Sequence, residues 1–288
     1  MRGIVLAGGY GTRLYPMTQF TNKHLLNVYD KPMIFYPISV LMIAGIKEIL
    51  IITSSTYLNS YRQLLGDGSR YGCKFYYKTQ DTPSGIPQAL IIGEKFINNE
   101  DFCLILGDNF FYGNDLTDLL TKINFEDKKS IIFSYFVNEP EEFGVLKIKK
   151  NKFIDIIEKP KKFVSNYVVP GIYFYKPDAV KIAKNLKKSR RGEYEINDIN
   201  RYYLKKNKLK IIEVGRGVIW FDVGSSFSNL NEVSNLIKSI QNRSGKNIAC
   251  LEEIAFLKKY INKVQIKNII KKIPNCNYKN YLNSLLIK

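Results

Sequence analysis

Residues 3–16 read GIVLAGGYGTRLYP and place a short apolar run directly before a glycine cluster that ends in an arginine. Glycine lets backbone N–H groups approach an anion closely, and Arg13 can donate two hydrogen bonds to phosphate oxygens. A Rossmann dinucleotide turn requires G-x-G-x-x-G, but the sixth position counted from Gly9 is Leu14. An ATP-binding P-loop requires Lys followed by Ser or Thr after the glycines, and this stretch has neither. The pattern predicts a strand followed by another kind of phosphate-binding loop.

Strand-like and helix-like patterns alternate along the first half of the chain. β-Branched or aromatic runs bounded by Gly, Asp or Asn lie at residues 3–9, 48–53, 73–80, 102–109 and 130–137. Amphipathic stretches lie between them at residues 32–46, 58–65, 87–97 and 115–123. This alternation predicts an α/β protein in which helices cover both faces of a mainly parallel sheet.

The pattern changes after Pro140. Strand-like segments at 143–160 and 167–175 precede helical stretches at 178–186 and 196–206, strands at 209–214 and 219–221, and a helical tail. No internal repeat, low-complexity linker or Gly/Ser-rich hinge interrupts the sequence. We therefore expect a main domain over residues 1–240 and a helical C-terminal extension, residues 241–288, packed on the same domain.

Composition limits the class of protein. The 288 residues are 45% hydrophobic, which is enough for a substantial core, and no apolar run is long enough to cross a bilayer. Without a signal-peptide pattern at the start, we expect a cytoplasmic protein with reduced, structural cysteines. The net charge of +18 is spread over scattered lysines rather than gathered in one stripe, so we expect neither a nucleic-acid nor a membrane partner.

Six polar residues and one glycine are further candidates for the site, and most of them stand at the ends of predicted strands, where open α/β sheets bind their ligands. Taken alone, the aspartates among them also fit Asx turns, and the lysines also fit a solvated surface. These candidates are Lys23, Gln80, Gly85, Asp108, Glu158, Lys159 and Asp222.

The segments LAGGYGTRLYP, YDKPMIFYPISVLMIAGI, QLLGDGS, LGDNFFYG, EKP, RRGEYEINDIN and EEIAF resemble the glucose-1-phosphate thymidylyltransferases. The resemblance covers nearly the whole chain. It implies a three-layer αβα nucleotidyltransferase (Rossmann-like) fold with a mixed, mostly parallel central sheet, a catalytic domain over 1–240 and a possible subunit interface in 241–288. It also implies Mg²⁺-dependent transfer of a thymidylyl group from dTTP to α-D-glucose 1-phosphate, a homotetramer, and the first step of dTDP-L-rhamnose biosynthesis.

The resemblance also assigns roles to individual residues. The catalytic residues would be Arg13, Lys23, Asp108, Lys159 and Asp222, with Asp108 and Asp222 holding Mg²⁺. The nucleotide would be bound by Gly8, Gly9, Gly11, Thr12, Arg13, Lys23, His24, Gln80, Gly85 and Asp108, with Gln80 and Gly85 at the thymine. The sugar phosphate would be bound by Gly144, Glu158, Lys159 and Val169.

Some positions depart from the family pattern. His24 stands where Gln is usual and brings a charge that would respond to pH between 5 and 8. Leu257 replaces an Arg near a second, regulatory nucleotide site, which puts feedback regulation there in doubt. Further departures are Tyr10, Asn27 and Pro170. Two alternatives stay open: a related enzyme that prefers UTP or another sugar phosphate, and a non-catalytic sugar-nucleotide sensor.

Overall fold

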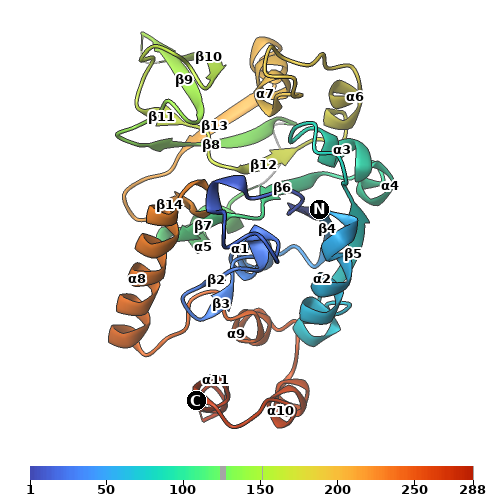
Figure 1. Cartoon of the computed structure of the whole chain (residues 1–288), viewed down its shortest axis with the longest axis vertical. Helices are drawn as coiled ribbons and strands as arrows, with labels where there is room; N and C mark the ends of the chain where they lie inside the picture. Colours follow the sequence, from blue (N-terminus) through green and yellow to red (C-terminus); the bar gives the residue numbers. More distant parts are fainter. Residues whose placement is uncertain (124–127, 151, 288) are drawn as a thin grey trace.

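The computed structural model describes residues 1–123, 128–150 and 152–287 (Figure 1). Asn151, inside the predicted strand region 143–160, and Lys288, the end of the predicted extension, lie outside the described residues. Within the described chain, a 10-stranded sheet crosses the molecule. Its strands lie in the order β10 (Lys152–Glu158), β9 (Gly144–Lys149), β11 (Tyr167–Val168), β8 (Ser130–Phe136), β12 (Ile172–Tyr175), β6 (Phe102–Leu106), β1 (Arg2–Leu6), β4 (Glu48–Thr53) and β5 (Lys74–Thr79), with β13 (Leu209–Glu213) also paired to β8.

The sheet is mixed, as predicted. Strands β6, β1, β4 and β5 run parallel, which matches the alternation of strands and helices in the first half of the sequence. Strand β12 lies antiparallel between β6 and β8, and the hairpin of β9 and β10 is antiparallel as well. The part of the chain after Pro140 therefore extends the sheet beyond the parallel strands.

Helices cover both faces of the sheet, so the predicted three layers are confirmed. Strand side chains alternate between the faces: Val5 belongs to one core and Ile4 to the other. One layer includes α1 (Phe35–Ile43), α2 (Leu58–Leu65), α5 (Asp115–Thr121) and α9 (Leu251–Leu257). The other includes α3 (Gln88–Ile92), α4 (Glu94–Ile97), α6 (Ala179–Lys184) and α7 (Ile196–Lys205), and the predicted helix 87–97 is divided at Gly93.

A two-stranded antiparallel sheet of β7 (Asn109–Tyr112) and β14 (Ile219–Asp222) lies beside the main sheet. Its register sets Asp222 opposite Asn109, and the Val223 N–H donates to the Asp108 carbonyl at 2.9 Å. Helix α8 (Phe227–Ser244) packs on this small sheet and on β2 (Asn27–Val28), which pairs with β3 (Lys31–Pro32). The sequence predicted the strand at 219–221 but not its partner.

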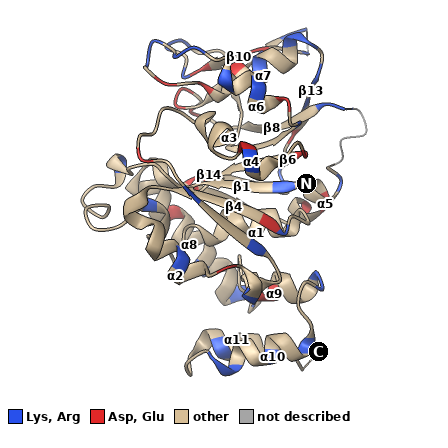
Figure 2. Cartoon of the chain, turned by 90° about the vertical axis from the view of Figure 1, so that its right-hand side faces the viewer, with Lys and Arg blue, Asp and Glu red and all other residues tan. Residues whose placement is uncertain are grey.

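The C-terminal segment is helical, as predicted, although α8 continues across the expected boundary at residue 240. Helices α10 (Lys263–Lys271) and α11 (Asn277–Ser284) lie at the end of the molecule opposite β9 and β10 (Figure 1). Lysines and arginines are spread over many elements, from β13 to α10 and α11 (Figure 2). Among the described helices, none is both long and apolar enough to cross a membrane.

Candidate active site

The predicted site residues meet at the point where the strand order reverses. From β1 the chain first builds β4 and β5 on one side and then returns to build β6 on the other. Open α/β sheets bind ligands at such switch points, beyond the carboxyl ends of the strands. The glycine loop follows β1 and Asp108 follows β6, and the Gly107 N–H donates to the Leu6 carbonyl at 2.9 Å. The loop and Asp108 are therefore neighbours.

Close packing explains why the loop needs glycine at two positions. Gly11 has a left-handed backbone with φ of 67°, and a Cβ there would lie 2.8 Å from the side chains of both Lys23 and Thr18. At Gly8 a Cβ would lie 2.6 Å from Oε1 of Gln80. The short helical turn η1 (Thr12–Leu14) then places Arg13, which is half-exposed, at the end of the loop.

Lys23 and Asp108 form a buried ion pair beside this loop. The Lys23 ammonium, in the turn η2 (Lys23–Leu25), donates to Oδ2 of Asp108. Burial alone would raise the pKa of Asp108, but the charge of Lys23 outweighs it and lowers that pKa to about 2. Burial would likewise lower the pKa of Lys23, and the charge of Asp108 raises it instead. Both groups are therefore charged at neutral pH.

Asp222 reaches the same place from β14. Its Oδ1 is buried and finds no hydrogen-bond partner among the described residues. Burial and the nearby charge of Asp108 raise its pKa to about 7. A buried carboxylate oxygen that has no hydrogen-bond donor can bind a cation instead. Together, Asp222 and the neighbouring carboxylate of Asp108 offer the oxygen ligands that a hard divalent cation prefers. Gly224 leaves room there, because a Cβ on it would lie 3.0 Å from both Cβ of Asp108 and the Lys23 amine.

The raised pKa of Asp222 predicts how pH changes the stability of the metal-free protein. The unfolded chain releases this proton near the ordinary aspartate pKa of 3.8, whereas the folded chain keeps it until about pH 7. Folding stability from this group is therefore complete below pH 4 and is lost as the pH rises through about 7. In EDTA, the unfolding free energy of the wild type should fall relative to Asp222→Asn by up to about 1.4 kcal/mol per pH unit below pH 7. If the difference in unfolding free energy between the two proteins stayed constant from pH 5 to 8, the prediction would be contradicted.

The predicted sugar residues lie together on β9, β10 and the segment that follows β11. Glu158 pairs with Gly144 in the register of β10 and β9, and the Val169 N–H donates to the Gly144 carbonyl at 2.9 Å. Asn197 of α7 donates to Oε2 of Glu158 at 2.6 Å and fills the space that a side chain on Gly144 would occupy. Burial raises the pKa of Glu158.

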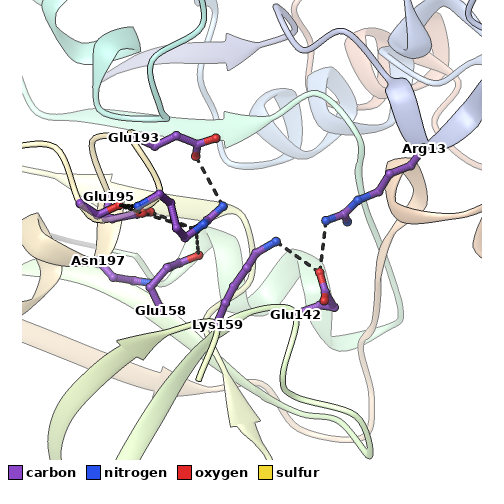
Figure 3. A network of polar contacts seen from close by, with 9 residues as sticks. Arg13, Glu142, Glu158, Lys159, Glu193, Glu195 and Asn197 are labelled. Carbon is purple, nitrogen blue, oxygen red and sulfur yellow. Dashed lines mark hydrogen bonds and ion pairs between the residues drawn. The ribbon is translucent and has the colours of Figure 1, made fainter. Parts of the chain in front are cut away.

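Arg13 and Lys159 point toward Glu142 from different parts of the chain (Figure 3). Oε2 of Glu142 contacts the Arg13 guanidinium at 3.1 Å and the Lys159 ammonium at 3.3 Å, so one carboxylate joins the two predicted phosphate-binding residues. Arg191 contacts Glu158 at 3.4 Å. Glu142, Asn197 and Arg191 were not among the predicted site residues, although Arg191 and Asn197 stand inside the segment RRGEYEINDIN.

The predicted base-binding residues lie between β5 and α3. Gln80 is buried with its side-chain oxygen next to Gly8 of the glycine loop. Gly85 has φ of 115° and passes so close to the Tyr194 backbone that a Cβ would overlap it. Gln80 and Gly85 are therefore held in fixed positions beside the loop.

His24 differs from its predicted role. It is 2% exposed and lies under the loop, with Nδ1 2.7 Å from Oδ1 of Asn22. Burial and the charge of Lys23 lower its pKa to about 3, so it stays neutral between pH 5 and 8 and the predicted charge response is wrong. We expect the buried His24 ring to pack beneath the loop and help hold Lys23 in place, and not to contact a nucleotide. Tyr10 is 65% exposed and donates to the Asp81 carbonyl at 3.0 Å.

Comparison with known proteins shows that the chain is similar to enzymes that form sugar nucleotides. A family model described as "Nucleotidyl transferase" matches residues 2–239. A glucose-1-phosphate thymidylyltransferase of Neisseria meningitidis serogroup A is 45% identical over 100% of both chains. A Bacillus anthracis structure with a sucrose, which bears the same enzyme name, is 40% identical with a TM-score of 0.76, covering 82% of this chain and 94% of that one. A UDP-glucose pyrophosphorylase with UDP-glucose is 27% identical with a TM-score of 0.71, covering 83% and 98%.

Proposed function

The chain belongs to the glucose-1-phosphate thymidylyltransferases, within the nucleotidyl transferase family, and we propose that it joins dTTP to α-D-glucose 1-phosphate to give dTDP-glucose and pyrophosphate. One observation supports this most. Two aspartates from distant parts of the sequence meet at Lys23 beside the glycine loop, and the buried Oδ1 of Asp222 has no partner among the described residues.

The residues suit an in-line displacement between two polyanions. A phosphate oxygen of glucose 1-phosphate attacks the α-phosphorus of dTTP, and the bond from that phosphorus to the bridging oxygen breaks as pyrophosphate leaves. The attacking phosphate is already largely dianionic near pH 7, because its second pKa is about 6, so no strong general base is required. The protein must hold the two phosphates in line and offset their charge.

Each cation has a place in this scheme. The loop of Gly8, Gly9, Gly11 and Thr12 would bind the triphosphate, with Arg13 and Lys23 on the charge that develops on pyrophosphate. Lys159 and Arg191 would hold the phosphate of glucose 1-phosphate, while Gly144, Glu158 and Val169 contact the sugar. Glu158 is already held by Asn197, so its carboxylate is in position to accept from a sugar hydroxyl.

Asp108 and Asp222 would hold Mg²⁺. Bound there, the ion would offset charge on the nucleotide phosphates and help to orient them. Asp108 is ionised at neutral pH, and Asp222 would lose its proton on binding. Lys23, which pairs with Asp108 in this structure, is then free to turn towards the phosphates.

Product analysis tests the proposed function directly. The purified protein is incubated with each of several nucleoside triphosphates and sugar 1-phosphates in Mg²⁺, and the products are identified by mass. We expect dTDP-glucose and pyrophosphate from dTTP and glucose 1-phosphate, and no product when EDTA removes the metal. Absence of any sugar nucleotide would favour the non-catalytic sensor, and product from UTP alone would favour the uridylyl alternative. UTP is included because the chain is also similar in structure to a UDP-glucose pyrophosphorylase.

Other features of the proposal come from the family alone. We propose a cytoplasmic homotetramer whose interfaces include part of residues 241–288, and a place at the first step of dTDP-L-rhamnose biosynthesis. The catalytic domain would be residues 1–240, close to the 2–239 that the family model matches. Leu257 is 70% exposed on α9 and offers no charge to a second nucleotide, so we expect no feedback regulation through this position.

The Glu142 contacts predict an effect on substrate binding. Because Glu142 occupies both Arg13 and Lys159 in the free protein, incoming phosphates must displace it. We expect Glu142→Gln to lower the KM for both substrates about two- to fivefold, the range expected for exposed ion pairs. Steady-state kinetics at low ionic strength measure it. Glu141→Gln removes the same charge from an exposed neighbour that makes no ion pair among the described residues, and an equal change in that variant would contradict the prediction.

A further inference from the structure

Two glutamines beside the glycine loop are joined by a hydrogen bond. Gln80 follows β5, and Gln88 is the first residue of α3. Nε2 of Gln80 donates to Oε1 of Gln88 at 2.7 Å. The backbone N–H of Ser84 donates to the same oxygen at 2.9 Å. Oε1 of Gln88 therefore accepts two hydrogen bonds from the loop that it closes.

These contacts decide which way the Gln80 carboxamide faces. The oxygen and nitrogen of a glutamine side chain are told apart by their partners, and a backbone N–H can only donate. The Gln88 atom beside Ser84 must then be the oxygen. Since that oxygen can only accept, the Gln80 group that faces it must be the NH₂ group. Oε1 of Gln80 consequently faces the opposite way, over Gly8.

The loop between the two glutamines is held in place by its own contacts. The Tyr194 N–H donates to the Ser84 carbonyl at 2.8 Å, and the Gln88 N–H to the Gly85 carbonyl at 3.3 Å. Gly85 can pass Tyr194 only because it has no side chain. Hydrogen bonds thus connect Tyr194, Ser84, Gln88 and Gln80 in series. Rotation of the Gln80 amide would break the last of these bonds and set two acceptors, Oε1 of Gln80 and Oε1 of Gln88, against each other.

We propose that Gln88 is a positioning residue that selects the class of nucleobase, because it makes Gln80 present an acceptor to the base. Thymine and uracil carry a donor at N3, whereas N3 of cytosine is an acceptor. Within the described residues no donor reaches Oε1 of Gln80, so this oxygen is available to a base. A base without the N3–H would leave two acceptors facing each other. The inference rests on the proposed function, since it takes Gln80 as the residue that meets the base.

Two variants of Gln88 test the inference. Gln88→Met keeps the length of the side chain but removes the acceptor, so the Gln80 amide can rotate. Gln88→Glu keeps an oxygen that accepts from both Gln80 and Ser84. Calorimetric dissociation constants for dTTP and dCTP are measured for each protein in Mg²⁺, without sugar phosphate. We expect the dTTP preference to fall about tenfold in Gln88→Met, equivalent to one buried hydrogen bond, and to persist in Gln88→Glu.

The ratio of the two constants separates positioning from general damage, because a distorted loop would weaken both nucleotides alike. A ratio in Gln88→Met equal to that of the wild type would overturn the inference. Loss of the dTTP preference in Gln88→Glu would overturn it as well. The Glu variant remains a test if the Met variant does not fold. Equal binding of dTTP and dCTP by the wild type would overturn it too. The binding measurement requires no turnover. If the wild type failed to make dTDP-glucose, the proposed function would be rejected, and the ratio of dissociation constants would still test the role of Gln88.

Discussion

Asp108→Asn should lower the turnover of dTDP-glucose synthesis about 10²- to 10³-fold, the range found when a charge-stabilising group is removed from an active site. Asparagine keeps the shape of aspartate but not its charge. It would therefore be a poor ligand for Mg²⁺ and would leave the Lys23 ammonium without its counter-charge. Because the fold around it is unchanged, the KM for dTTP should change much less than turnover. Steady-state rates of pyrophosphate release at saturating substrates measure the effect.

The matched control is Asp118→Asn. Asp118 lies exposed on α5 and makes no ion pair within the part of the chain that the structure describes, so the same chemical change there should leave the rate unaltered. Thermal unfolding of both variants shows whether the fold is intact. A folded Asp108→Asn protein with turnover within about threefold of the wild type would rule out a catalytic metal at this carboxylate.

Lys23→Met is the second change with a large expected effect. Methionine fills the volume of the lysine stem but leaves the carboxylate of Asp108, which is 7% exposed, without its charged partner, so that only Asn109 still donates a side-chain hydrogen bond to it. Breaking such a buried pair from one side costs about 3 kcal/mol, so the unfolding free energy in EDTA should fall by about that amount. Turnover should fall about 10²-fold or more, because no cation then faces the leaving pyrophosphate from this side.

The stability loss has its own internal check. In the double variant Lys23→Met with Asp108→Asn, no charge is left buried alone, so the double variant should be more stable than Lys23→Met. Mg²⁺ should also stabilise Lys23→Met more than the wild type, since the ion replaces the missing charge. Denaturant unfolding with and without Mg²⁺ measures both effects. Lys122→Met, an exposed lysine after α5, is the control, and a double variant as unstable as Lys23→Met would refute the account of the pair.

The parallel part of the fold could be predicted because its signals are local. Each of the strands β1, β4, β5 and β6 is a short β-branched or aromatic run between turn residues, and α1, α2 or the pair α3 and α4 separates each strand from the next along the chain. That alternation also placed the glycine loop and Asp108 at strand ends. The two-stranded sheet of β7 and β14 could not be found this way, because its strands pair across more than a hundred residues of intervening chain. Only the resemblance to a family had brought Asp108 and Asp222 together.

The features of the site that could not be predicted all depend on tertiary contacts. His24 stands next to Lys23 in a polar stretch, and nothing in the sequence reveals that its ring is buried against Gly107. Glu142 lies in an acidic stretch whose sequence is typical of a solvated loop. Its contacts with Arg13 and Lys159 exist only in the folded chain. The direction of the Gln80 amide depends on Gln88 and on one backbone N–H. Such properties belong to tertiary contacts rather than to residue type.

A crystal structure of the protein with Mn²⁺ and dTTP tests the central claim most directly, because anomalous scattering locates the ion without assumptions. We predict one Mn²⁺ beside the glycine loop, bound to an oxygen of Asp108 and an oxygen of Asp222 at about 2.0–2.3 Å each and to the nucleotide phosphates. Electron density that places the ion on the phosphates alone, with either carboxylate out of coordination range, would contradict the claim that these two aspartates form one metal site.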